Sequence, residues 1–158
     1  MFVLLIPSHK RQGHCIIDPP HCWLIKIGNN VTLATGVYIL AHDASMKNST
    51  GYAKIGRVTI GDNVFIGAKS IILPNVRIGN NVIVGCGSVI TKDIPDNSVV
   101  AGNPGKIITT MDEYLKKQKL LQSKFPCFGD EYTLRNNITN KQKQEMQKKL
   151  ENNIGFIK

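Results

Sequence analysis

The sequence predicts an all-β solenoid, wound into triangular coils of short parallel strands and followed by short α-helices. Branched aliphatic residues recur every six positions, and the position after each is usually Gly or Ala. A period of six matches neither the 3.6-residue period of a helix nor the alternation of a simple strand. The density of Gly and Asn also argues against a helix. Because internal repeats are the strongest signal of fold, we base the fold class on this repeat.

The repeat has two unbroken stretches that together build the predicted core. The marked positions are Ile27, Leu33 and Ile39, and then Ile60, Ile66, Ile72, Ile78, Val84 and Ile90. In "IGDN" and "IGNN" we expect Gly and Asn to adopt the positive φ that a tight corner needs. Three hexads form one coil, and neighbouring coils stack about 4.8 Å apart. The predicted stacked pairs are Ile60 with Ile78, Ile66 with Val84, and Ile72 with Ile90.

The repeat also divides the chain. We expect a lead-in over residues 1–26, the solenoid over 27–108 with a loop at 43–57, and a helical tail over 109–158. The loop "AHDASMKNSTGYAKIGR" is rich in polar residues and glycine, which is typical of an exposed and functional segment. The apolar run at residues 2–6 is too short for a membrane span or a signal peptide. Four cysteines at irregular spacings then favour reduced thiols in a cytoplasmic protein.

The formal net charge is +9. Nine Lys and Arg face five Asp and Glu up to residue 105, and eleven face six beyond it. Such a balance suits an anionic ligand, a polyanion or an acidic membrane surface. The lysines of the tail have no interleaved aromatic residues, so we predict no nucleic-acid partner. Membrane association is not expected either, although a lipid-linked acceptor would change that expectation.

Residues 22–108 closely resemble the hexapeptide acyltransferases, in particular the sugar O-acetyltransferases related to the maltose and galactoside enzymes. The resemblance rests on "WLIKIGNNVTLATGVYILAHD", on "GSVITKDIPDNSVVAGNPGKII" and on the intervening hexads. It implies a left-handed β-helix, a homotrimer, and transfer of acetyl from acetyl-CoA to a hydroxyl at a site between subunits. The few coils favour oligomerisation independently, because short solenoids bury little surface.

His42 stands where the repeat stops, and we predict that it is the general base. Imidazole titrates near neutrality, so it can take a proton from a sugar hydroxyl that attacks a thioester. On position alone, a histidine bonded to a backbone carbonyl is an equal alternative, and the resemblance favours catalysis. Asp43 could contact the acceptor or orient the ring, or it could simply open a turn.

The resemblance also assigns residues to acetyl-CoA. Ala68 and Cys86 correspond to contacts with the pantetheine arm, Thr91 and Lys92 to its middle, and Lys106 to the nucleotide phosphates. An ordinary solvated lysine is the alternative at both lysine positions. Cys86 could instead form an acyl-enzyme, but it has no acid or histidine as a sequence neighbour, so a small corner residue is the better interpretation.

We predict no metal site. "HCIIDPPHC" contains His14, Cys15, His21 and Cys22, but their spacing matches no usual Cys₂His₂ site. The Asp18-Pro19-Pro20 break suggests a rigid, extended entry into the first coil. Only His42 lies within the repeat, which also argues against a hexapeptide-fold carbonic anhydrase with three histidine ligands.

The tail predicts two helices. Thr110 with Glu113, and Thr139 with Gln142, have capping-box spacing. The first helix carries one apolar side and is expected to pack on the solenoid as a cap, and the second carries a thin apolar stripe.

The predicted function is acetyl-CoA-dependent O-acetylation of a sugar hydroxyl by direct attack. Two alternatives remain open at this point. One is a non-catalytic or degenerate solenoid that serves as a scaffold, and the other is N-acetylation of an aminosugar.

Overall fold

The computed structural model describes residues 10–11 and 14–158. The chain forms two compact units, Met1–Asp112 and Glu113–Lys158. Residues 1–9 of the predicted lead-in, with its apolar run, lie outside the described residues.

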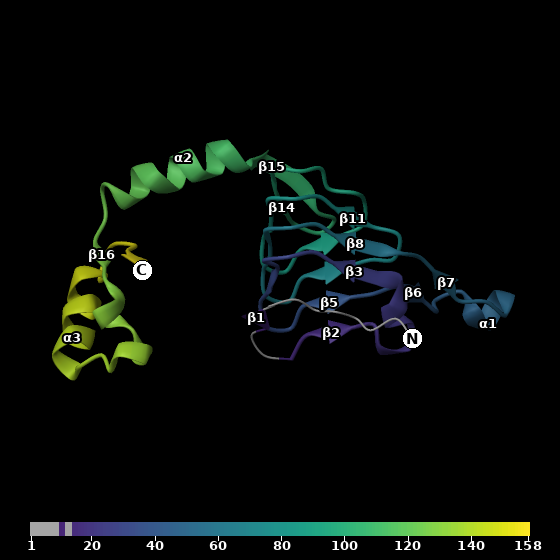
Figure 1. Cartoon of the computed structure of the whole chain (residues 1–158), viewed down its shortest axis with the longest axis horizontal. Helices are drawn as coiled ribbons and strands as arrows, with labels where there is room; N and C mark the ends of the chain where they lie inside the picture. Colours follow the sequence, from purple (N-terminus) through teal and green to yellow (C-terminus); the bar gives the residue numbers. More distant parts are fainter. Residues whose placement is uncertain (1–9, 12–13) are drawn as a thin grey trace. The chain divides into compact units, whose positions relative to one another are not determined.

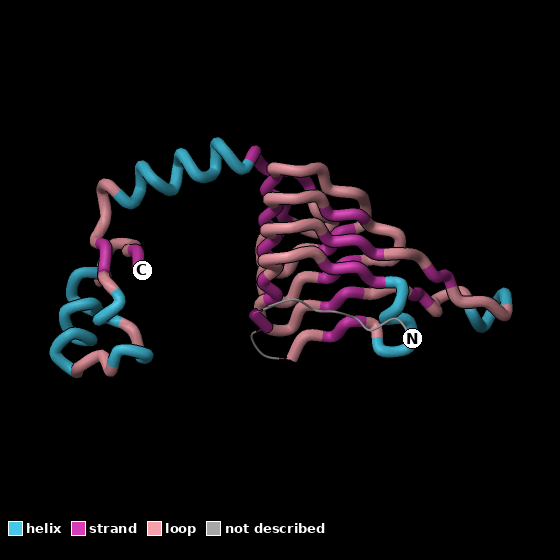
Figure 2. Tube along the Cα trace, in the orientation of Figure 1, coloured by secondary structure: helices cyan, strands magenta, loops and turns pink. Residues whose placement is uncertain are grey.

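The first unit is built on three sheets of mostly parallel strands, which the chain contributes in rotation (Figure 1). The first sheet contains β1 (Lys10–Arg11), β4 (Thr32–Leu33), β9 (Val64–Ile66), β12 (Val82–Val84), β14 (Ser98–Ala101) and β15 (Lys106–Thr110). The second contains β2 (Ile16–Ile17), β5 (Tyr38–Ile39), β10 (Ile71–Ile72) and β13 (Val89–Ile90). The third contains β3 (Ile25–Ile27), β8 (Val58–Ile60) and β11 (Arg77–Ile78). Successive coils therefore stack on one another, as Figure 2 shows.

The strand register confirms the stacking that the repeat predicts. Ile60 pairs with Ile78, Ile66 with Val84, and Ile72 with Ile90. These six side chains and those of Leu33 and Ile39 are at most 1% exposed, so the aliphatic columns form the core. Each pair joins residues eighteen apart, which is one turn of three hexads.

A loop interrupts this register between the first and second stretches of the repeat. Ile27, Leu33 and Ile39 pair with Ile60, Ile66 and Ile72, which are 33 residues further on. The extra fifteen residues form an antiparallel pair, β6 (His42–Asp43) with β7 (Lys54–Ile55), around the short helix α1 (Lys47–Thr50). This excursion projects from the coils (Figure 1), and the amide of Gly56 donates to the carbonyl of Ala41 at its base.

The corners between the third and first sheets explain the Gly-Asn repeat, and they correct one part of its interpretation. Asn30, Asn63 and Asn81 have positive φ as predicted, and Asn97 in "IPDN" has it as well. Gly61, however, is not in this region, and a Cβ added there would lie 2.7 Å from the carbonyl oxygen of Gly79. The glycine that precedes each pair of polar residues is therefore required by close stacking of the coils, and the asparagine provides the turn.

The sheets extend further toward the N-terminus than the repeat indicates. Ile16 and Ile17 pair with Tyr38 and Ile39 one coil later, over a separation of 22 residues. The longer separation accommodates the 3₁₀ turns of η1 (Pro19–Leu24), which disrupt the six-residue spacing. Part of the predicted lead-in is thus a further coil.

The other end of this unit is closed by β15, which runs antiparallel to β14 and ends the succession of parallel strands. The helix α2 (Met111–Gln122) begins directly after it, and none of its residues is buried. No helix among the described residues combines the length and apolarity that crossing a membrane requires.

The second unit is small, and its buried aromatic residue is Phe128, which is 5% exposed. It contains β16 (Cys127–Phe128) paired with β17 (Phe156–Ile157), η2 (Asp130–Tyr132), η3 (Leu134–Asn136) and α3 (Asn140–Lys149). The predicted capping box is confirmed, because the hydroxyl of Thr139 accepts from the Gln142 amide while the Gln142 side chain accepts from the Thr139 amide. The predicted packing of the tail on the solenoid stays a prediction.

Candidate functional site

His42 occupies the corner that follows the second sheet, at the point where the loop leaves the coil. The preceding residues are fixed by the core, because Ile39 and Ala41 are fully buried and the amide of Leu40 donates to the carbonyl of Ile72. The histidine is the first residue of β6, and its side chain is 31% exposed. The ring is thus anchored at its base and accessible at its edge.

The carboxylate of Asp18 holds the ring. Its two oxygens lie 2.7 and 2.9 Å from Nδ1 of His42. The same carboxylate accepts from the backbone amide of Ala41 at 2.6 Å, and Asp18 is only 1% exposed. Burial alone would raise the pKa of Asp18, but the hydrogen bonds from the His42 ring and the Ala41 amide outweigh it, so the pKa lies below its ordinary value of 3.8.

This contact fixes the tautomer of the neutral imidazole. A carboxylate can only accept, so Nδ1 of His42 carries the proton and Nε2 keeps its lone pair. Within residues 10–11 and 14–158, no side chain or backbone group forms a hydrogen bond with Nε2. The arrangement leaves one unprotonated nitrogen available to a proton donor, as a general base requires.

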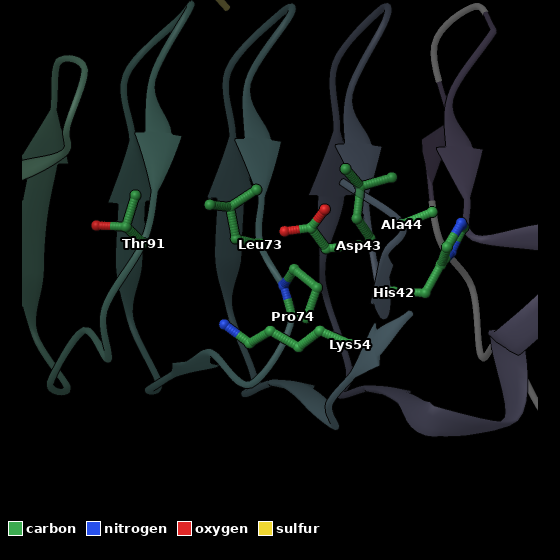
Figure 3. Close-up of a pocket in the computed structure, with 8 residues that line it drawn as sticks. His42, Asp43, Ala44, Lys54, Leu73, Pro74 and Thr91 are labelled. Atoms are coloured by element: carbon green, nitrogen blue, oxygen red, sulfur yellow. The ribbon is translucent and has the colours of Figure 1, made fainter. Parts of the chain in front are cut away.

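An open pocket of about 420 Å³ adjoins His42 (Figure 3). Its lining combines the corner of the second sheet with the base of the loop. The lining residues are Leu40, His42, Asp43, Ala44, Lys54, Leu73, Pro74 and Thr91. Leu73 and Thr91 come from successive coils, as Figure 3 shows. The volume falls within the usual range for small-molecule sites, and the lining mixes apolar walls with a few polar groups.

Asp43 and Lys54 face each other across the antiparallel pair of β6 and β7. Asp43 accepts a hydrogen bond from the amide of Ser45 at 2.9 Å, so it opens the turn. The hydrogen bonding to Ser45, and to a smaller extent the positive charge of Lys54, lowers the pKa of Asp43. The ring of His42 is oriented by Asp18, and Asp43 plays no part in that contact. Lys54 supplies a cationic group to the pocket that the sequence analysis did not select.

The residues assigned to acetyl-CoA lie at more than one corner. Thr91 lines the pocket with His42, and exposed Lys92 follows it. Ala68 and Cys86 are stacked at the corner after the first sheet, where the amide of Gly87 donates to the carbonyl of Ala68 at 2.8 Å. Lys106 opens β15 opposite Ala101 and is exposed. One chain thus brings His42, Asp43 and Thr91 together and places Ala68 and Cys86 at another corner.

Asp18 is the site residue that sequence reasoning missed. It is separated from His42 by 24 residues, and its Asp-Pro-Pro context indicated only a rigid break. A signal was present, because Ile16 and Ile17 form an aliphatic pair immediately before it. Once Ile17 is placed beside Ile39, Asp18 follows at the corner where His42 leaves the coil.

Two family models match this chain. Residues 57–92 match the bacterial transferase hexapeptide, a model of six repeats, and residues 25–41 match the hexapeptide repeat of succinyl-transferase. Both matches lie within the stacked coils.

Individual proteins are similar to about two-thirds of this chain. Protein CapG of Staphylococcus aureus is 48% identical over 99 residues, which cover 60% of this chain and 58% of CapG. A maltose O-acetyltransferase from Clostridium difficile 630 is 42% identical with a TM-score of 0.59, covering 66% of this chain and 56% of that one. A galactoside acetyltransferase in complex with coenzyme A is 29% identical with a TM-score of 0.51, covering 68% and 66%.

The chain thus spans less than two-thirds of the length of each of these proteins. The family-model match over residues 57–92 includes Thr91, and the match over residues 25–41 ends directly before His42. The chain therefore carries hexapeptide repeats of the bacterial transferase type, and its coils resemble those of the maltose and galactoside acetyltransferases.

Proposed function

We propose that this protein is an O-acetyltransferase that moves an acetyl group from acetyl-CoA to a sugar hydroxyl, with His42 as general base. The proposal includes a left-handed winding of the coils, a homotrimer and a cytoplasmic location. Its main support is the contact between Asp18 and His42, which leaves Nε2 unprotonated beside an open pocket.

The proposed chemistry needs His42, which lines the pocket, and Asp18, which holds the His42 ring. Nε2 of His42 takes the proton of the acceptor hydroxyl while that oxygen forms a bond to the thioester carbonyl carbon. The carbon–sulfur bond then breaks, and the imidazolium returns its proton to the departing sulfur, which leaves as free coenzyme A. The buried carboxylate of Asp18 stabilises the imidazolium between these two transfers. A positioned general base such as His42 typically raises the reaction rate by about 10²–10⁴-fold.

The acyl donor is expected to lie along the corners that carry Thr91, Ala68 and Cys86. Ala68 and Cys86 have small side chains at the corner after the first sheet, and a backbone amide there, such as that of Ala68, could bond the thioester oxygen as it gains charge. Lys92 and Lys106 are exposed and can meet phosphates as point charges. Asp43 is retained as a candidate contact to the acceptor.

A trimer would join corners that one chain separates. The outward residues of the second sheet, Ile16, Tyr38, Ile71 and Val89, form a continuous apolar column, in which Tyr38 is 41% exposed. The third sheet presents Lys26, Thr59 and Arg77 outward instead. Exposed apolar surface of this kind commonly marks a protein interface, and polar surface commonly faces solvent. A base from one subunit could then meet a donor bound along its neighbour.

Replacing His42 with alanine tests the proposal. We expect kcat for acetyl transfer to fall by about 10²–10⁴-fold, with coenzyme A binding and assembly preserved. The assay measures thiol release from acetyl-CoA with a panel of sugars and aminosugars as acceptors. His14→Ala is the matched control, since this exposed histidine lies outside the pocket. Full turnover by His42→Ala would remove His42 from the mechanism.

Two further measurements separate the alternatives. Failure to bind acetyl-CoA, measured by thermal shift, would favour the scaffold. Amide products from the aminosugars would assign the activity to nitrogen instead of oxygen.

A further inference from the structure

His42 belongs to a compact group of three side chains, whose other members are Asp18 and His21. One ligand atom of each lies within 4.8 Å of the others. Nδ1 of His21 is 3.8 Å from Oδ1 of Asp18, and Nδ1 of His42 is 2.7 Å from Oδ2. The two imidazole rings are 4.9 Å apart between centroids. Two imidazole nitrogens thus converge on one buried carboxylate.

His21 contributes an unusual atom to this group. Its Nδ1 is buried and has no hydrogen-bond partner among the described residues. Most buried polar atoms are hydrogen-bonded, so an unpaired nitrogen here needs an explanation. The local backbone places it there, because the amide of His21 donates to the carbonyl of Asp18, and the ring lies between those of Trp23 and His42.

We propose that Asp18, His21 and His42 bind a divalent transition-metal ion, with zinc as the representative case. Two imidazoles and one carboxylate are a donor set that suits zinc, cobalt or nickel, whereas magnesium prefers oxygen ligands. Zinc bonds to nitrogen and oxygen are about 2.0–2.2 Å long, so tetrahedral ligand atoms stand about 3.3 Å apart. The separations of 2.7 and 3.8 Å lie on either side of this value, so small side-chain rotations would complete the site. This proposal differs from the sequence-based prediction of no metal site. That prediction weighed the Cys and His spacing and the single histidine within the repeat, and it did not consider that folding brings His42 against Asp18 and His21.

Metal binding would have a direct effect on the reaction, and this consequence rests on the proposed function. The ion takes the lone pair of Nδ1 of His42, so the proton now on Nδ1 must move to Nε2 through solvent. The neutral ring keeps one proton in total, but Nε2 can no longer accept one from a hydroxyl. Acetyl transfer is therefore blocked while the ion is bound and returns when a chelator removes it.

Titration calorimetry on the full chain, after removal of metal with a chelator, tests the binding. We expect one zinc ion per chain and no comparable binding of magnesium. His21→Gln should weaken zinc binding by about ten-fold or more, because even loss of an outer-shell partner commonly costs 10–100-fold. Cys22→Ser is the matched control, because it removes the neighbouring thiol and leaves the three proposed ligands in place. Thermal melting of each variant verifies that it is folded.

Rates with and without zinc test the consequence, with each variant compared with its own metal-free rate. We expect zinc to inhibit wild-type and Cys22→Ser. For the same degree of inhibition, His21→Gln should need a zinc concentration at least about ten-fold higher. Equal zinc affinity of wild-type and His21→Gln would overturn the site, as would loss of binding in Cys22→Ser. Zinc binding without inhibition of an active enzyme would overturn the proposed blockage. An inactive chain that still binds zinc through His21 would refute the proposed function and leave the site in place.

Discussion

At the scale of single residues, the proposed chemistry depends on a pair that lies far apart in sequence. The side chain of His42 is partly exposed to solvent. The carboxylate of Asp18 is buried, and it accepts hydrogen bonds from both the His42 ring and the Ala41 amide. A buried carboxylate without such partners would be costly, so these bonds are also what makes its burial tolerable. The same contact therefore determines the tautomer of the ring and contributes to the corner that presents it.

Asp18→Asn tests Asp18 as a positioning residue. We expect kcat to fall by about 10²-fold while the KM for acetyl-CoA stays nearly constant, because the amide keeps the shape but cannot stabilise an imidazolium. Steady-state kinetics with acetyl-CoA as the varied substrate measures both constants. A merely structural role would lower thermal stability and raise KM without this selective loss. A larger loss of kcat in Asp43→Asn than in Asp18→Asn would transfer the orienting role to Asp43.

At the scale of elements, the corner between the third and first sheets is built from stacked asparagines. The Nδ2 of Asn63 donates to Oδ1 of Asn81 at 3.3 Å, and Nδ2 of Asn81 donates to Oδ1 of Asn97 at 3.0 Å. A parallel row continues through Asp62 and Asn80, whose backbone and side-chain groups bond across the coils. The corner thus joins coils by side-chain bonds as well as by the strand ladders.

Two substitutions at Asn81 separate the backbone effect from the side-chain effect. Asn81→Ala and Asn81→Gly both remove the ladder bonds, but only glycine adopts positive φ without steric cost. We expect the alanine variant to be less stable than the glycine variant by about 1–2 kcal/mol in free energy of unfolding. Chemical denaturation of both variants gives the difference. Equal stabilities would mean that the ladder, and not the backbone conformation, determines the choice of asparagine.

At the scale of the whole molecule, the faces of the solenoid differ in polarity. The second sheet exposes an apolar column, and Phe65 on the first sheet is 43% exposed. The third sheet exposes charged and hydroxyl side chains. A short solenoid buries too little surface on its own, and apolar outer faces are the natural place for subunits to meet.

Tyr38→Glu should lower the molecular mass in solution from that of the proposed trimer toward that of a monomer. The reason is that a buried, unpaired carboxylate at an interface costs more than the contacts around it supply. Light scattering after size-exclusion chromatography measures the mass. Thr59→Glu, on the polar third sheet, is the control and should leave the mass unchanged. A trimer that survives Tyr38→Glu but not Thr59→Glu would place the interface on the other face.

The six-residue repeat determines which features of the fold could be predicted from the sequence. The columns of Ile60, Ile66 and Ile72 with their partners were predictable residue by residue, because a strict period and the strand spacing fix which side chains stack. The general-base role of His42 stays a prediction, because its place at the break fits a structural histidine equally well and only the resemblance favours catalysis. The coil before residue 27 was not predictable, because η1 changes the separation of Ile17 and Ile39 and so conceals the period.

The sequence by itself determined the period, the aliphatic core, the asparagine corners and the position of the loop, because each depends on spacing along the chain. Only the tertiary structure decided that Asp18 and His21 lie against His42. That contact depends on how the irregular coil that contains η1 stacks on the regular coil that contains Tyr38 and Ile39. The tertiary structure also decided which glycines face a neighbouring backbone, because close approach between coils has no local signature in sequence.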